Sequence, residues 1–394
     1  MHRWVTFSVN TRALAGLPLA LDRRAGNLSA CRDYLLANTK IGSFGLADIL
    51  GSHERVITAI GDFLVALDFD YADAYSGRIR LVIASYRASD QRAAARADAI
   101  VPGVAPGYQS DPAITKAEKT LGPEVFADRY DPTAAFTTPG SHVADAPYQP
   151  NWSDLLSPGS LGRDAIWEIT SFLADVGILE HPIDPFAVIV RPFVGDWAGL
   201  LRCADVFQQV AMMLRLNADC TTDESMLIPD VWTGNVAGIG QAVIERFTQI
   251  MQTGAQRCDA LADAYRRIAK SVQDNANLME MLVTDLIDLG SDAALDVVTL
   301  GFFELFAAGG QVRDFVNTMR GVLRIIDDVT SLKDTAKSAA DDAANGFGIL
   351  LKPAPLTAAG PIPTQIPIPT APPPPPRHAG KPTSIPWDIW LGGS

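Results

Sequence analysis

The sequence predicts an all-α protein, in which long antiparallel helical hairpins form bundles. Apolar residues recur at helical spacing over long stretches, and strand-type alternation is almost absent from the second half. Hydrophobic residues make up 48% of the 394 residues, enough to bury sizeable cores. We divide the chain into four parts: an N-terminal helical hairpin at 1–100, a proline-rich connector at 101–160, a helical bundle at 161–345 and a disordered proline-rich tail at 346–394.

Two apolar stripes predict the first hairpin. Leu21, Leu28 and Leu35 recur every seven residues and mark one face of a helix. The stretch 38–45 breaks that helix with two glycines. A second helix follows and continues to Tyr86, with a bend expected near Gly77. Its apolar stripe consists of Val56, Ile60, Phe63, Leu64, Leu67, Tyr71, Tyr75, Ile79 and Val82.

The connector is dense in proline, which fixes φ and removes a backbone donor, so a long helix is excluded there. One short helix is expected at 114–120. In the tail, the run 372–376 is all proline and favours an extended polyproline helix. We expect the tail to be a spacer, although Trp387 and Trp390 keep open the alternative that it docks a partner.

The bundle is predicted to begin near Gly162. After Gly195-Asp196-Trp197, a long apolar stripe runs to Leu214, and a polar break is expected at 217–224. Trp232-Thr233-Gly234 is expected at the turn before the next long helix. Further helices are predicted at 274–289, 293–308 and 311–344.

Composition and motifs argue against several functions. The net charge of −13 opposes binding to nucleic acid and adsorption to an anionic membrane. The four cysteines form no Cys-x-x-Cys pair, so buried thiols are expected. No phosphate-binding loop or nucleophile elbow occurs, and the histidines lie in separate segments. We therefore predict no catalytic residues, no metal and no cofactor.

The triplet Trp232-Thr233-Gly234 has a physical logic at a turn between two antiparallel helices. Glycine permits close approach or a left-handed backbone. A neighbouring tryptophan can bury its ring against the opposing helices and keep its indole N–H hydrogen-bonded. We therefore predict turn and packing roles for Trp232 and Gly234, and likewise for Gly195 and Trp197.

The order of Gly195-Asp196-Trp197, a helix, Trp232-Thr233-Gly234 and a long helix resembles the Trp-x-Gly superfamily of type VII (ESX) secretion substrates of actinobacteria. The resemblance covers about residues 162–345. Residues 8–100 resemble the small helical proteins associated with ESX secretion, although Gly42-Ser43-Phe44-Gly45 replaces Trp-x-Gly at their turn. This hairpin ends in Tyr86-x-x-x-Asp90, which has the form of the family's secretion signal.

The resemblance implies a non-enzymatic secretion substrate or accessory protein. In those families a motor ATPase reads the signal, so Tyr86 would be an aromatic anchor and Asp90 an acceptor one turn later on the same helix face. The implied partners are that ATPase or a small helical Trp-x-Gly protein, with a homo-oligomer as a further option. The implied location is the medium or the cell envelope, reached without a cleavable signal peptide.

Two alternatives stay open from the sequence. The first is an oligomeric, membrane-interacting or pore-forming secreted effector, supported by the stretch Gly301-Phe302-Phe303-Glu304-Leu305-Phe306. The second is the N-terminal export module of a toxin that lacks its catalytic domain, because too few residues follow the proline run to form one.

Overall fold

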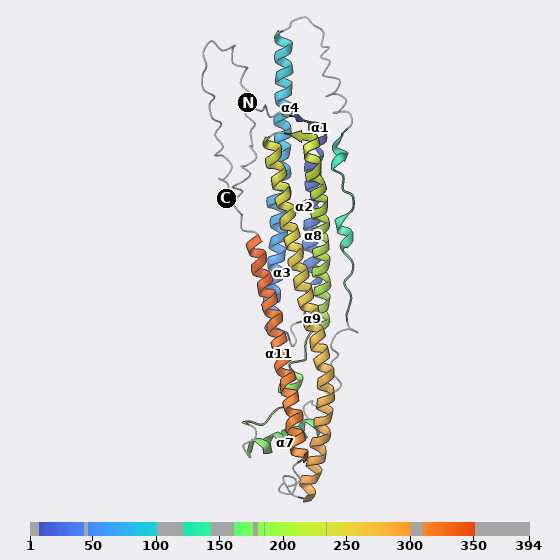
Figure 1. Ribbon diagram of the computed structural model, residues 1–394, viewed down its shortest axis with the longest axis vertical. Helices are drawn as coiled ribbons and strands as arrows, with labels where there is room; N and C mark the ends of the chain where they lie inside the picture. The colour runs from blue at the N-terminus through green and yellow to red at the C-terminus, as the bar shows by residue number, and fades with distance from the viewer. Residues whose placement is uncertain are drawn as a thin grey trace, which may run out of the picture.

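The computed structural model describes residues 8–42, 46–100, 121–142, 161–175, 180–184, 186–233, 235–300 and 310–350. It confirms the all-α class, because long helices pack side by side into an elongated bundle (Figure 1). In these ranges the strands are limited to β1 (Ser8–Val9) and β2 (Trp232–Thr233), which pair antiparallel.

The first hairpin buries the first predicted stripe and those residues of the second stripe whose side chains the structure describes. Its elements are, in order, α1 (Thr11–Leu14), α2 (Gly16–Asn38), α3 (Ala47–Ala66), the π-helix η1 (Leu67–Asp73) and α4 (Ala74–Ile100). Leu21, Leu28 and Leu35 lie in the core, as their seven-residue spacing requires. The irregularity expected near Gly77 is located earlier, at the π-helix between α3 and α4.

The second half contains longer helices than the sequence indicated. Its elements are α7 (Leu161–Asp175), the π-helix η4 (Phe186–Val190), α8 (Trp197–Val231), β2, α9 (Asn235–Leu300) and α11 (Gly310–Leu350).

Two helix boundaries from the sequence are wrong. The polar break at 217–224 lies inside α8, where Asn217, Thr221 and Glu224 are buried and the hydroxyl of Thr221 donates to the carbonyl of Asn217. The segments predicted at 274–289 and 293–308 belong in their described part to one helix, α9. A glycine such as Gly290 costs a helix only about 1 kcal/mol, which packing against α11 outweighs.

The end of the bundle also differs by a few residues. α11 continues to Leu350, and Phe347 is fully buried with its ring 5.1 Å from that of Phe63. The helix predicted at 114–120, the stretch 301–306 and the tail with Trp387 and Trp390 lie outside the described residues.

One large core joins the two halves of the chain. α8 and α9 pair antiparallel, α2 packs on α8, and α11 lies against both α9 and α3 (Figure 1). A second core surrounds Trp232 at one end of the bundle and collects side chains from α1, α2, α4, α8 and α9. The predicted hairpin and the predicted bundle thus share their apolar interior. All four cysteines are buried and unbridged, as expected.

The described part of the connector, residues 121–142, is mostly extended. It contains two short 3-10 turns, η2 (Pro123–Phe126) and η3 (Pro132–Ala135), and it runs along the outside of α2 and α8. Figure 1 shows it as the teal segment beside the bundle.

Candidate functional site

The structure brings Tyr86 and Trp232 into contact. Tyr86 lies on α4, and Trp232 follows the last residue of α8. The indole Nε1 of Trp232 donates to the Tyr86 hydroxyl at 3.3 Å, and the two rings meet edge to face with centroids 6.5 Å apart. The two motifs that carry the family resemblance therefore meet at one end of the bundle.

The backbone at Trp232 is extended because β1 pairs with it. Trp232 has φ −152° and ψ 120°, which ends α8. The amide of Asn10 donates to the carbonyl of Val231 at 2.7 Å, and the amide of Ser8 donates to Oγ1 of Thr233 at 2.9 Å. The first bond satisfies a carbonyl that the end of α8 would leave unpaired, and the two bonds together hold the turn in place. Gly234 itself lies outside the described residues.

The glycine that receives the Trp232 ring is Gly240, one turn into α9. A Cβ at Gly240 would lie 3.0 Å from Cζ3 of Trp232 and 2.8 Å from the hydroxyl of Tyr75. That hydroxyl donates to the Gly240 carbonyl at 2.8 Å. Gly238, two residues earlier, has open space around its α-carbon. Sequence reasoning did not identify this packing role for Gly240, because only the fold shows which glycine faces the ring.

Tyr86 and Asp90 differ sharply in exposure. Tyr86 is 6% exposed, and burial raises the pKa of its hydroxyl, which stays protonated. Asp90, one turn later on α4, is exposed. α4 continues past this point to Ile100 and extends beyond the turn between α8 and α9 (Figure 1). A partner at this end would thus meet Asp90, whereas Tyr86 faces the core.

Gly195 and Trp197 lie at the opposite end of α8. That helix has 35 residues, which places Trp197 about 50 Å from Trp232. Trp197 is buried and its Nε1 donates to the carbonyl of Phe193 at 2.8 Å. A Cβ at Gly195 would lie 2.9 Å from Cδ2 of Leu46, so a larger residue would not fit without movement. These residues pack a separate region and do not join the Tyr86–Trp232 contact.

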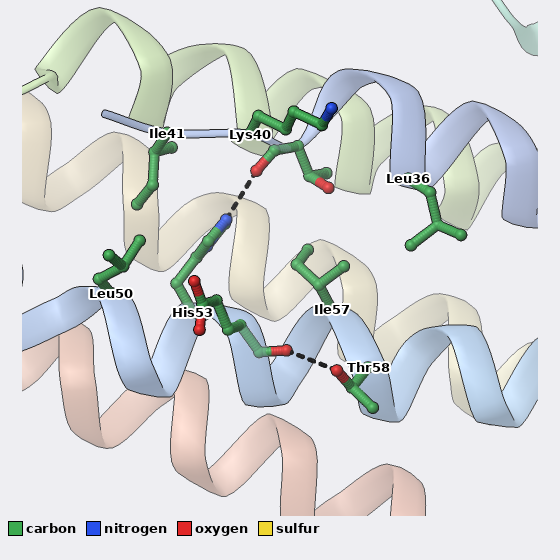
Figure 2. Close-up of a pocket in the computed structure, with 9 residues that line it drawn as sticks. Leu36, Lys40, Ile41, Leu50, His53, Ile57 and Thr58 are labelled. Carbon is green, nitrogen blue, oxygen red and sulfur yellow. Dashed lines mark hydrogen bonds between the residues drawn. The ribbon is translucent and has the colours of Figure 1, made fainter. Parts of the chain in front are cut away.

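A hollow of about 520 Å³ opens beside α3, between its first half and the end of α2 (Figure 2). It is lined by Leu36, Thr39, Lys40, Ile41, Leu50, His53, Glu54, Ile57 and Thr58. His53 is one of these lining residues and is itself almost fully buried. The Nε2 of His53 is 2.8 Å from the carbonyl of Thr39, and Nδ1 is 3.1 Å from the hydroxyl of Tyr265.

These contacts leave His53 no free nitrogen for chemistry. A carbonyl only accepts, so Nε2 carries the proton and Nδ1 accepts from Tyr265. Cys203 Sγ lies 4.0 Å from Nε2, but burial raises the pKa of this thiol to about 12. The proton on Nε2 and the neutral thiol are incompatible with a cysteine–histidine nucleophile, which requires a thiolate.

Comparisons add no relative. No protein-family model, curated protein or solved structure matches this chain. Within the part of the chain that the structure describes, we find no helix with the length and apolar character that a membrane crossing requires. In the same ranges, no three histidine, cysteine or carboxylate side chains gather as metal ligands.

Proposed function

We propose that the chain is a non-enzymatic substrate or accessory protein of an actinobacterial type VII (ESX) secretion system. It is exported to the medium or the cell envelope through a helical signal at Tyr86 and Asp90. The observation that supports this proposal is the Tyr86–Trp232 hydrogen bond, which joins the Tyr-x-x-x-Asp motif to the Trp-x-Gly motif within one chain.

The contacts suggest different roles for the two signal residues. Because Tyr86 is buried against Trp232, it fixes the position of α4 relative to the turn between α8 and α9. Asp90 is exposed on the same helix and presents its carboxylate to a partner. Tyr86 is thus a positioning residue, and Asp90 is the residue that a secretion ATPase or a small helical Trp-x-Gly protein would contact.

Export into the culture medium tests this division of roles. Asp90→Ala should lower the exported fraction about tenfold, the size expected when one hydrogen bond to a charged group is lost. Tyr86→Phe keeps the ring against Trp232 and should be exported almost normally. Asp62→Ala, which removes an exposed carboxylate from α3 of the same hairpin, serves as the matched control.

The decisive variant combines Tyr86→Ala with Asp90→Ala. Its intracellular level and helicity should be measured alongside export, so that loss of folding is separated from loss of recognition. Normal export of this folded double variant would remove the proposal.

A further inference from the structure

A buried arginine ties the connector to the bundle. Arg24 on α2 is 0% exposed. Its Nη1 donates to Oδ1 of Asn217 on α8 at 3.0 Å, and its Nη2 bonds the carboxylate of Asp128. Asp128 belongs to residues 121–142, which we call the strap. Arg24 thus links α2, α8 and the strap in one cluster.

The strap is held by further contacts along its length. Phe126 is buried in the second core, and the ring of Phe136 stacks on Tyr34 with centroids 4.7 Å apart. A Cβ at Gly16 would lie 2.1 Å from the carbonyl oxygen of Pro123, so the strap crosses α2 where a side chain is missing. The strap therefore covers an apolar part of the bundle that its release would expose.

Glu224 brings a second carboxyl group to the same guanidinium. It lies on α8, is 3% exposed, and has Oε1 3.4 Å from Nε of Arg24. Among the described residues, no hydrogen bond reaches either of its carboxyl oxygens or Nε of Arg24. An ionised carboxylate in such surroundings is costly, so this arrangement suits a neutral Glu224. Burial accordingly raises the pKa of Glu224 to about 8.

We propose that residues 121–142 form a releasable strap, which loosens when Glu224 ionises and competes with Asp128 for Arg24. With Glu224 neutral, the guanidinium of Arg24 binds the carboxylate of Asp128 and the amide oxygen of Asn217, and the strap is closed. The charge of an ionised Glu224 must be stabilised either by that guanidinium or by contact with water. Both routes weaken the Arg24–Asp128 bond. A second carboxylate on the same buried guanidinium shares its charge and repels Asp128, although it uses Nε and not the Nη2 that donates to Asp128, and hydration of Glu224 requires the strap to lift.

Charged groups on α2, on α8 and on the strap determine how strongly the ionisation of Glu224 weakens the strap. Arg23 on α2 donates to Asp128 at 2.8 Å from Nε, and this bond does not depend on Arg24. Ionisation should therefore weaken the strap without detaching it. The groups that face Glu224 or its neighbours are Arg23 and Arg24 from α2, Asp128, Arg129 and Tyr130 from the strap, and Asp219, Cys220 and Asp223 from α8.

The direction of the pH dependence follows from proton linkage. The closed strap favours protonated Glu224, whose pKa of about 8 lies above the ordinary glutamate value, whereas water contact after opening lowers that pKa. Closure therefore binds a proton. It is favoured at low pH and is lost as the pH rises through about 8.

Trypsin cleavage after Arg129 measures strap opening. The Arg129 side chain is 76% exposed. The backbone of the strap at this residue must nevertheless move away from α8 before it can enter the active site of a protease. The rate is compared between the native chain and Glu224→Gln, which keeps the neutral form at every pH. Using their ratio removes the protease's own pH dependence. We expect a ratio near one at pH 6 and about tenfold faster cleavage of the native chain at pH 9, as for loss of one charge-assisted hydrogen bond.

Two further variants sharpen the test. Asp128→Asn removes the negative charge that Arg23 and Arg24 bind and replaces one of the two acceptor oxygens by an NH2 group, so it should be cleaved faster than the native chain already at pH 6. Glu280→Gln, at an exposed site on α9, should behave as the native chain does. Equal cleavage of native chain and Glu224→Gln at pH 9 would overturn the proposal, and so would native-like cleavage of Asp128→Asn at pH 6.

Deuterium uptake covers the case in which Asp128→Asn does not fold. At pH 9 the strap peptides of Glu224→Gln should exchange more slowly than those of the native chain, while peptides from the interior of α9 should not differ. Equal uptake in the strap would reject the competition between Glu224 and Asp128.

Discussion

The indole nitrogen of Trp232 donates a hydrogen bond to the hydroxyl of Tyr86 at 3.3 Å, across 146 positions of sequence. This bond closes the end of the bundle where α4, β1 and the turn between α8 and α9 converge. The two aromatic side chains, which lie far apart in the sequence, therefore form one packed contact. The exposed Asp90 lies one helical turn from Tyr86.

Replacing Trp232 by alanine should destabilise the protein strongly. The ring is 1% exposed and packs against Tyr86 of α4 and Gly240 of α9, and truncation of a buried large aromatic side chain costs about 3–5 kcal/mol. Trp232→Phe should cost less, because it keeps much of the packing and loses the hydrogen bond to Tyr86, worth about 1 kcal/mol. Urea unfolding followed by circular dichroism measures both; an unchanged midpoint for Trp232→Ala would refute the packing role.

Two glycines on α9 should respond in opposite directions to alanine. Gly240→Ala places a methyl group 2.8 Å from the Tyr75 hydroxyl and 3.0 Å from the Trp232 ring, and overpacking of this kind costs about 1–3 kcal/mol. Gly238→Ala fills open space and should stabilise the helix by about 0.5–1 kcal/mol. Thermal melts of the pair provide an internally matched comparison, and similar shifts for both would contradict the close approach of Trp232 to Gly240.

Stability should fall in mild acid because of His53. Burial lowers the pKa of His53 in the folded protein, where Nε2 donates to Thr39 and Nδ1 accepts from Tyr265. The unfolded chain takes up a proton near the ordinary histidine pKa of about 6.5. The folded state is therefore favoured above that pH and loses this contribution as the pH drops below it.

The measurement is the free energy of unfolding between pH 7 and pH 5, compared with that of His53→Gln. The native chain should show the steeper loss on acidification, because glutamine does not titrate. Parallel curves for the two proteins would mean that His53 is not held neutral by its surroundings.

Shortening the chain should be tolerated only up to the end of α11. A chain that ends at Leu350 keeps Phe347, which is buried against Phe63, and should melt near the full-length temperature. A chain that ends at Ala344 loses that ring and should be weakened by about 3–5 kcal/mol. Phe347→Ala in the full chain is the matched control; a normal melt for the shorter chain would show that this contact does not stabilise the bundle.

Much of the fold could be predicted because helical periodicity is a local property. The seven-residue spacing of Leu21, Leu28 and Leu35 identified a buried helix face without any knowledge of what covers it. Separation of the cysteines likewise predicted free, buried thiols. The boundaries were less accurate, since α11 passes the predicted end and α9 continues through Gly290.

The candidate sites depended on partners that local sequence cannot show. The polar stretch 217–224 indicated a helix break. In the structure, Asn217 and Glu224 instead face the buried Arg24, which belongs to a helix nearly two hundred residues earlier in the sequence. The signals in the sequence were the adjacent Arg23 and Arg24 inside an apolar stretch and the polar residues at helical spacing in α8. Neither signal indicates that the other is its partner.

By itself, the sequence determined the helical class, the apolar faces and the two aromatic motifs. Only the tertiary structure decided that Tyr86 is buried while Asp90 is exposed, that Gly240 receives the Trp232 ring, and that Arg24 serves two carboxyl groups. The physical reason is that an apolar side chain is stabilised by burial against almost any apolar surface. A buried hydroxyl or guanidinium instead needs a specific partner at hydrogen-bond distance, and the packing of distant segments selects that partner.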